Sequence, residues 1–350
     1  MLLPQPRWEF VNLKLEDVLK KYRDLLNTCL PRSLAPNLDF YAEHVPYIYP
    51  TVKYKCFGGS RMTGSIKTCD RPGHSCFRNV VSFVALPGRQ IFKSVGRALR
   101  TVFEVCWSSW CFKDQARSGA ELSKRYNKTK NRPANEVHCC AKCKKPMAAP
   151  GGITADAGQA YEAVRRPFVS GCLDALFKTA STPKFAAKTI SVLKTVKYYG
   201  FVGGRIHQPA EDRVVFWLDR IRHCVDRLLA MDIYRFGDGF VQQETGIPIG
   251  GPISGVVLDI VCSVLEYLFD KLWETLAKAC NLKGQRSDYI ATGRYADDAA
   301  MLSKWFCSSC LRSFLLGAYS SELKFETTTD SHAYERINTL LLMDFNLVFL

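Results

Sequence analysis

The stretch Tyr295-Ala296-Asp297-Asp298 places two adjacent carboxylates after an aromatic residue, between two strand-like segments. Residues 288–294 (Asp-Tyr-Ile-Ala-Thr-Gly-Arg) lead into it, and residues 299–302 (Ala-Ala-Met-Leu) lead out. A β-hairpin can hold two such carboxylates at its tip, where they can bind a divalent metal. Paired aspartates are also common in solvated turns, so this stretch alone is weak evidence for a metal site. Two segments upstream strengthen it.

The first of these segments, residues 153–161, reads Ile-Thr-Ala-Asp-Ala-Gly-Gln-Ala-Tyr: a short strand ends at Asp156, and Tyr161 follows five positions later. The second, residues 246–255, reads Gly-Ile-Pro-Ile-Gly-Gly-Pro-Ile-Ser-Gly and leads into a long apolar-periodic stretch. Its glycines let the backbone approach a ligand without Cβ clashes, and its prolines fix the turn. Taken alone, each segment could equally be ordinary: a surface aspartate, a core tyrosine or a plain helix entry.

The order of aspartate, glycine-rich turn into helix, and double aspartate resembles motifs A, B and C in the palm of reverse transcriptases. The resemblance covers residues 151–350 well and the N-terminal part only loosely. It implies an α+β fold: a right-hand polymerase palm, which is an antiparallel sheet backed by helices, together with fingers. Residues 341–347 resemble the primer-grip hairpin, and the chain stops just after them, so we expect the thumb to be missing.

The same resemblance implies two domains. Residues 1–150 would form a fingers-like region that carries a basic, cysteine-containing excursion (118–147). Residues 151–350 would form the palm, with part of the fingers between motifs A and B (165–245). The excursion holds eight basic residues against two glutamates, which suits either a solvated loop or contact with nucleic acid.

By resemblance, Asp156 and Asp297 would be the principal catalytic metal ligands, and Asp298 would be a supporting ligand. Nucleotidyl transfer is an in-line displacement at phosphorus, in which two metal ions roughly 3.5–4 Å apart activate the attacking oxygen and stabilise the leaving pyrophosphate. Mg²⁺ favours carboxylate and phosphate oxygens as ligands. We therefore expect two Mg²⁺ ions, or Mn²⁺ in their place, as cofactors.

The resemblance also implies nucleotide-binding residues. Tyr161 would stack under the sugar and block a 2′-hydroxyl, which favours dNTPs over rNTPs. Gly250 and Gly251 would lie against the template base and the incoming nucleotide; many relatives carry a serine where this chain has Gly251. Arg78 is the best candidate for a fingers residue that meets the triphosphate.

Three further basic residues are weaker candidates. Arg71 and Lys67 stand behind Arg78 as candidates for the triphosphate contact. Lys324, in the stretch 323–326, is a candidate for the lysine of motif D, although it does not fall clearly at the expected offset.

Composition narrows the class of protein. The 350 residues are 47% hydrophobic and 23% charged, which is typical of a globular chain, and no apolar run is long enough to span a membrane. The net charge of +15 favours a polyanionic partner. The N-terminus has no signal-peptide pattern, so we expect an intracellular protein, nuclear or cytoplasmic, and not a secreted one.

Fifteen cysteines in an intracellular chain predict reduced thiols rather than a disulfide scaffold. Cys140-x2-Cys143, with His138 and Cys139 beside it, offers half a zinc site, and Cys69, His74 and Cys76 offer another cluster. Cys307-x2-Cys310 lies on an expected helix. Because a complete CxxC…CxxC pair with standard spacing is missing, the sequence leaves a structural zinc open but does not favour it.

Periodicity predicts helices over residues 13–30, 91–106, 187–199, 214–231 and 254–280, and strands over residues 77–85, 153–156 and 339–350. The resemblance to reverse transcriptases implies an RNA-directed DNA polymerase, retroelement-derived, with an RNA template, a DNA or RNA primer and dNTPs as partners, no membrane, and protein partners undetermined. An RNA-directed RNA polymerase is a rival that Tyr161 argues against. A decayed or domesticated copy that binds nucleic acid without catalysis is a second rival, and an unrelated basic RNA-binding protein is a third.

Overall fold

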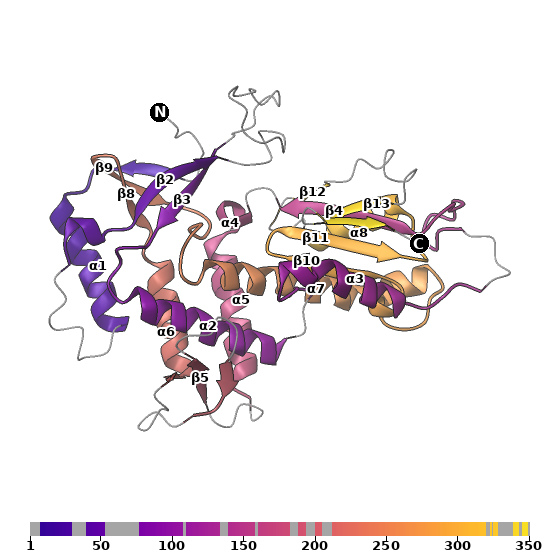
Figure 1. Cartoon of the computed structure of the whole chain (residues 1–350), viewed down its shortest axis with the longest axis horizontal. Coiled ribbons are helices and arrows are strands. Elements are labelled where there is room, and N and C mark those ends of the chain that lie inside the picture. Colours follow the sequence, from indigo (N-terminus) through magenta and orange to yellow (C-terminus); the bar gives the residue numbers. More distant parts are fainter. Residues whose placement is uncertain are drawn as a thin grey trace. The chain divides into compact units, whose positions relative to one another are not determined.

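The computed structural model of the chain (Figure 1) describes residues 8–29, 40–52, 77–107, 110–133, 139–157, 160–182, 188–193, 200–204, 212–319, 323, 325–327, 339–342 and 345–348. Contacts between residues divide the chain into two compact units. The first unit combines residues 1–102 with 177–256, and the second combines 103–176 with 257–350. Residues 103–150, which the sequence places with the fingers-like region, therefore group with the segment that carries Asp156.

Two sheets form the framework of the first unit. The larger has the strand order β1-β9-β8-β2-β3 and is antiparallel except where β2 runs parallel to β8; the smaller, antiparallel, has the order β6-β5-β7. The strands are β1 Trp8–Val11, β2 Tyr47–Val52, β3 Phe77–Ser82, β5 Thr189–Leu193, β6 Gly200–Val202, β7 Arg213–Trp217, β8 Ile233–Phe236 and β9 Gly239–Gln243.

Helices α1 (Leu15–Cys29) and α6 (Leu218–Leu229) contact each other in the first unit. The apolar residues Val18, Tyr22 and Leu25 recur at helical spacing on α1 and are buried, as the periodicity predicts. Arg220 of α6 donates hydrogen bonds of 2.7 and 2.8 Å to the carbonyls of Thr28 and Cys29. These bonds satisfy carbonyls that the C-terminal end of α1 leaves without a partner inside the helix.

An antiparallel four-stranded sheet, in the order β10-β11-β4-β12, is the framework of the second unit (Figure 1). Helix α8 contacts β4, β11 and β12, and helix α3 contacts β10. The hairpin β13–β14 contacts the same sheet through β13. The bounds are β4 Gly151–Ala157, β10 Ala291–Tyr295, β11 Asp298–Ser303, β12 Phe325–Thr327, β13 Thr339–Leu342, β14 Phe345–Val348, α3 Ser118–Asn127, α4 Ala160–Ala163 and α8 Ser308–Tyr319.

Three helices have residues in both units: α2 Arg89–Cys106, α5 Arg166–Ala180 and α7 Ser254–Ala279. Helix α7 is the helix that the apolar spacing of residues 254–280 predicts. No described helix combines the length and the apolar character that crossing a membrane requires.

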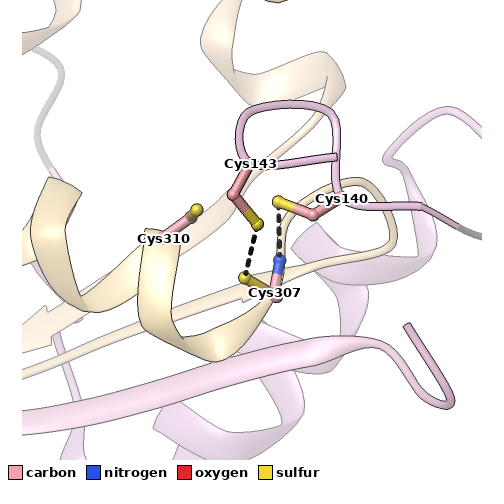
Figure 2. Close-up of side chains that lie close together, drawn as sticks. All are labelled: Cys140, Cys143, Cys307 and Cys310. Atoms are coloured by element: carbon pink, nitrogen blue, oxygen red, sulfur yellow. Dashed lines mark hydrogen bonds between the residues drawn. The ribbon is translucent and has the colours of Figure 1, made fainter. Parts of the chain in front are cut away.

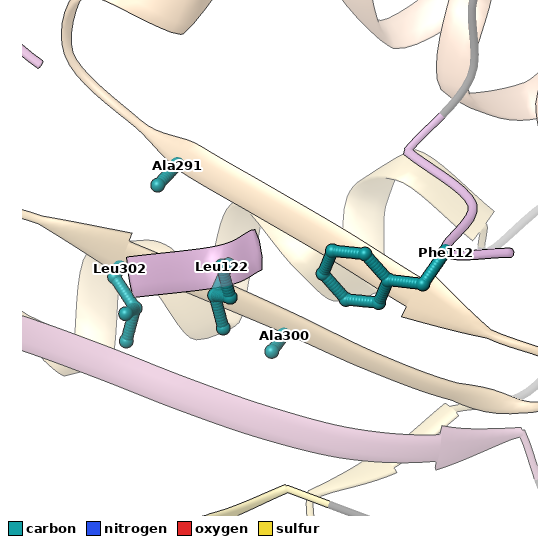
Figure 3. Close-up of a cluster of buried hydrophobic side chains, with 5 residues drawn as sticks. All are labelled: Phe112, Leu122, Ala291, Ala300 and Leu302. Carbon is teal, nitrogen blue, oxygen red and sulfur yellow. The ribbon is translucent and has the colours of Figure 1, made fainter. Parts of the chain in front are cut away.

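A hydrophobic cluster fixes helix α3 to the β10–β11 pair (Figure 3). Its members Phe112, Leu122, Ala291, Ala300 and Leu302 are all at most 5% exposed. Gly293 makes room for it, because a Cβ at that position would lie 2.0 Å from the Phe112 ring. Residues 118–127 of the basic excursion are therefore not a solvated loop but a helix anchored by its apolar side.

The mixed α+β class with antiparallel sheets is confirmed, but the helix predicted over residues 187–199 is wrong, and the helix predicted over residues 214–231 is wrong in its first residues only. Within residues 187–199 the structure has strand β5 (Thr189–Leu193), and residues 213–217 form strand β7 before α6 begins at Leu218. The two strands pair with each other, from Thr189 opposite Trp217 to Leu193 opposite Arg213. Their β-branched residues fit a sheet better than a helix, and the pairing outweighs the helical spacing.

Candidate active site

The stretch 295–298 forms the tight turn between β10 and β11. Tyr295 pairs with Asp298 across the hairpin, so Ala296 and Asp297 are the two central residues of the turn. Ala296 has a φ of +51°, the left-handed region that a two-residue hairpin turn requires at one or both central positions. The predicted hairpin with two carboxylates at its tip is therefore present.

Strand β4 brings Asp156 to the same end of the sheet. Asp156 is the direct cross-strand partner of Asp298, and the amide of Ala157 donates a 2.9 Å hydrogen bond to the carbonyl of Asp297. All three aspartates are partly exposed. Like charges directly opposite each other destabilise a sheet unless something offsets them, and a bound divalent cation does so. Main-chain pairing thus brings together the three aspartates that the sequence analysis identifies as candidate metal ligands.

Arg294, which the sequence motifs did not single out, anchors the hairpin to helix α7. Its fully buried guanidinium lies 2.6 Å from Asp259 Oδ1 and 2.6 Å from Glu266 Oε1. Its Nη1 also donates a 3.0 Å hydrogen bond to the carbonyl of Ala296 in the turn. Burial alone would lower the pKa of Arg294, but the carboxylates of Glu266 and Asp259 hold this pKa above its ordinary value.

The same network includes Tyr319, whose hydroxyl donates a 2.8 Å hydrogen bond to Glu266 Oε1. One sequence signal points to the network. Asp259 and Glu266 lie seven positions apart, on one face of α7, and both are buried among apolar residues. Buried acids on a helix need a cationic or hydrogen-bonding partner, and Arg294 is that partner.

Tyr161 lies on the short helix α4, just after the end of β4. Burial raises the pKa of its hydroxyl, and the neighbouring charges of Asp259 and Asp297 act in the same direction. Tyr161 is partly exposed, and its hydroxyl lies within electrostatic reach of Asp297 in the hairpin turn.

The remaining predicted nucleotide-binding residues belong to the first unit. Gly250 has a φ of +98°, and a Cβ there would lie 2.4 Å from the carbonyl oxygen of Val81 on β3. The amide of Val81 donates a 2.8 Å hydrogen bond to the carbonyl of Ile249. The glycine-rich turn is thus held against strand β3.

Gly251 directly follows Gly250, and Arg78 lies on the same strand as Val81. A Cβ at Gly251 would lie 2.4 Å from Ser254 Oγ, so a serine at 251 would displace that hydroxyl. Arg78 is exposed on β3, opposite Thr51. The weaker candidates Lys67, Arg71 and Lys324 lie outside the described residues.

A second constellation in the second unit consists of four cysteines (Figure 2). The sulfurs of Cys140, Cys143, Cys307 and Cys310 all lie within 4.8 Å of one another. The sequence offers Cys140-x2-Cys143 as half a zinc site and places Cys307-x2-Cys310 on an expected helix, and the structure brings these two pairs together. The remaining zinc candidates His138, Cys69, His74 and Cys76 lie outside the described residues.

Comparisons with known proteins give a partial likeness in structure only. No family model and no curated protein matches the chain. Telomerase from Candida albicans, in complex with a TWJ fragment of telomeric RNA, aligns with 70% of this chain and 35% of its own, at 13% identity and a TM-score of 0.43. Apo telomerase from Candida tropicalis aligns with 75% of this chain and 39% of its own length, at 14% identity and a TM-score of 0.45. The chain spans less than two fifths of these telomerases, and likeness at this level carries no functional conclusion.

Proposed function

We propose that the chain is an RNA-directed DNA polymerase that acts by two-metal nucleotidyl transfer and derives from a retroelement. The observation that carries the proposal is the direct pairing of Asp156 with Asp298, with Asp297 in the adjoining turn. An acidic strand end beside an acidic hairpin tip is the backbone arrangement that motifs A and C require. The sheet β10-β11-β4-β12 would then be the palm, and the five-stranded sheet of the first unit would belong to the fingers.

The acidic residues fit the ligand preference of Mg²⁺ or Mn²⁺, which take carboxylate and phosphate oxygens. Asp156 and Asp297 would hold the two ions, and Asp298 would support them. The bound ions would supply Lewis-acid activation of the primer 3′-oxygen and charge neutralisation at the triphosphate. The network of Arg294 keeps the turn, and therefore Asp297, in one position before substrate arrives, which is the preorganisation that such chemistry needs.

Substrate selection falls to a different set of residues in this proposal. Tyr161 would occupy the space next to C2′ of the incoming sugar and so exclude rNTPs. Gly250 and Gly251 would let the backbone approach the template base and the nucleotide, and Arg78 would meet the triphosphate. The net charge of +15 suits an RNA template with a DNA or RNA primer. An intracellular site of action, nuclear or cytoplasmic, is part of the same proposal.

Primer extension tests the function. The chain is incubated with a primed RNA template or a primed DNA template, each with dNTPs or rNTPs, and with Mg²⁺ or Mn²⁺. The proposal requires dNTP incorporation on RNA. Incorporation of rNTPs alone would identify an RNA-directed RNA polymerase, whereas binding without incorporation would identify a decayed or domesticated copy.

A further inference from the structure

Two CxxC pairs from distant parts of the second unit meet in one place (Figure 2). Cys140 and Cys143 lie in a turn before β4, and Cys307 and Cys310 lie at the start of α8, more than 160 positions further on. All four sulfurs lie within 4.8 Å of one another, and Cys143 Sγ lies 3.7 Å from Cys307 Sγ. In a tetrahedral site with Zn–S bonds of about 2.3 Å, two sulfurs are about 3.8 Å apart.

From this geometry we propose that the four cysteines form a structural zinc site. The ligands would be four thiolates around one ion, with no open position for a substrate. A disulfide does not account for the arrangement, since it joins only two sulfurs at about 2.05 Å. An iron–sulfur cube does not fit either, because its four irons would hold the cysteine sulfurs further apart than a single ion does.

The backbone holds each pair in a suitable shape. The amide of Cys140 donates a 2.8 Å hydrogen bond to the carbonyl of Lys145, and the amide of Lys144 donates one of 2.9 Å back to the carbonyl of Cys140. Lys144 has a φ of +60°, which closes the turn tightly enough for Cys140 and Cys143 to face the same point. The first pair is therefore set by main-chain bonds.

The second pair uses the beginning of a helix. Cys307 directly precedes α8 (Ser308–Tyr319), and Cys310 lies in its first turn. The amide of Cys307 lies 3.4 Å from Cys140 Sγ, which it faces as a hydrogen-bond donor across the two segments. Amides and the positive end of a helix stabilise thiolates, the form in which cysteine binds metal.

Exposure and charge also suit a metal. Cys140 and Cys310 are buried, whereas Cys307 is partly exposed and Cys143 is exposed, which leaves an entry path for an ion. Four thiolates and one Zn²⁺ carry a net charge of −2. The exposed residues Lys142, Lys144 and Lys145 lie in or beside the same turn and offset that charge.

The ion would lock the basic excursion onto the connection between β11 and α8. Weaker contacts already join these segments. The amide of Ala141 and Arg132 Nη2 donate hydrogen bonds of 2.8 and 2.7 Å to the carbonyl of Trp305, and Lys304 Nζ donates one of 2.7 Å to Asn131 Oδ1. Because α8 contacts β4 and β11, the zinc would support the sheet that carries the aspartates. It is separate from the catalytic ions proposed above and does not depend on them.

Metal content tests the proposal in the whole chain. The purified protein is analysed by plasma mass spectrometry for zinc and iron, and the zinc is exchanged for Co²⁺ to record its visible spectrum. We expect about one zinc per chain and the absorption of a tetrahedral cobalt–thiolate centre. Cys143→Ser or Cys307→Ser should lower zinc occupancy at limiting free zinc by more than about tenfold. The neighbouring Cys139→Ser should retain it.

Four results would overturn the proposal: folded protein without zinc, iron in its place, a disulfide between two of these cysteines, or equal zinc loss in Cys139→Ser. If the ligand variants do not fold, zinc removal from the wild type gives a second reading. Chelator treatment should lower the melting temperature and open residues 139–147 to proteolysis, and added Zn²⁺ should reverse both effects. No change in either measurement would also contradict a structural zinc.

Discussion

Asp156 on β4 and Asp298 on β11 are direct partners across an antiparallel pair of strands, although they lie far apart in the sequence. The carbonyl of Asp297, in the turn beside them, accepts a hydrogen bond from Ala157. The position of the acidic turn is therefore fixed by main-chain pairing to the strand that carries the third aspartate.

Tyr161 should select the sugar by steric exclusion. Replacing it with alanine opens space for a 2′-hydroxyl, so Tyr161→Ala should lower the preference for dNTP over rNTP by at least about tenfold. Tyr161→Phe keeps the ring and should keep most of the selectivity. The measurement is the ratio of incorporation efficiencies for the two nucleotides. An unchanged ratio in Tyr161→Ala would make Tyr161 a core residue only.

The glycine-rich turn should tolerate no side chain at Gly250. A Cβ there would clash with the Val81 carbonyl at 2.4 Å, and the φ of +98° adds strain, so Gly250→Ala should cost about 2 kcal/mol or more. Gly237 is the matched control: its φ is +60°, but nothing lies within 4 Å of a Cβ there. Gly237→Ala should cost only about 1 kcal/mol. Denaturant unfolding compares them, and equal costs would exclude the contact with Val81 as the cause.

Glu266, which is buried against Arg294, should contribute more to the stability of the fold than an exposed glutamate on the same helix. Glu266→Gln removes one of the two buried carboxylates that pair with the Arg294 guanidinium, and with it a charge-assisted hydrogen bond, and should destabilise the fold by about 2 kcal/mol. Glu274, also on α7, pairs with Lys278 at the surface, and Glu274→Gln should cost about 0.5 kcal/mol or less. The free energy of unfolding in denaturant is the measurement. If Glu266→Gln lowers the free energy of unfolding no more than Glu274→Gln does, the Arg294 network does not stabilise the fold.

Nucleic-acid binding should depend steeply on salt, and the basic excursion should contribute to it. Lys124→Gln with Lys128→Gln should reduce the slope of log affinity against log salt by about 2, if each lysine contacts one phosphate. Lys271→Gln with Lys278→Gln removes the same charge from exposed positions of α7 and should leave the slope nearly unchanged. Titration of an RNA–DNA duplex at several salt concentrations measures both. Binding that is insensitive to salt in the wild type would contradict the electrostatic account.

The sequence predicted features that depend on local pattern. Helix α7 and the hairpin after Tyr295 follow from short-range spacing and turn chemistry, and the position of Asp156 at a strand end follows from the same reasoning. The predictions that failed concern segments whose structure depends on pairing with residues far away in the sequence. Residues 189–193 show helical spacing but pair with residues 213–217, and nothing within either segment reveals that pairing.

The Arg294 network and the four-cysteine cluster of the second unit also depend on residues that are far apart in the sequence. Arg294 is one basic residue in a strand, and its importance appears only when Glu266 and Asp259 of α7 are placed beside it. The cysteine pairs at 140–143 and 307–310 have no standard spacing between them, so only the fold can join them.

We expect the acidic residues of β4 and the β10–β11 turn to form one catalytic metal site. Single-turnover incorporation of one dNTP on a primed RNA template, with Mg²⁺ and saturating enzyme, tests it most directly. Asp297→Asn should lower the rate at least about a thousandfold, because a lost ligand to a catalytic ion costs several kcal/mol of transition-state stabilisation. Asp238→Asn, the same change in the exposed turn between β8 and β9, should keep the wild-type rate. Wild-type protein that incorporates nothing, or Asp297→Asn protein that incorporates at the wild-type rate, would contradict the claim.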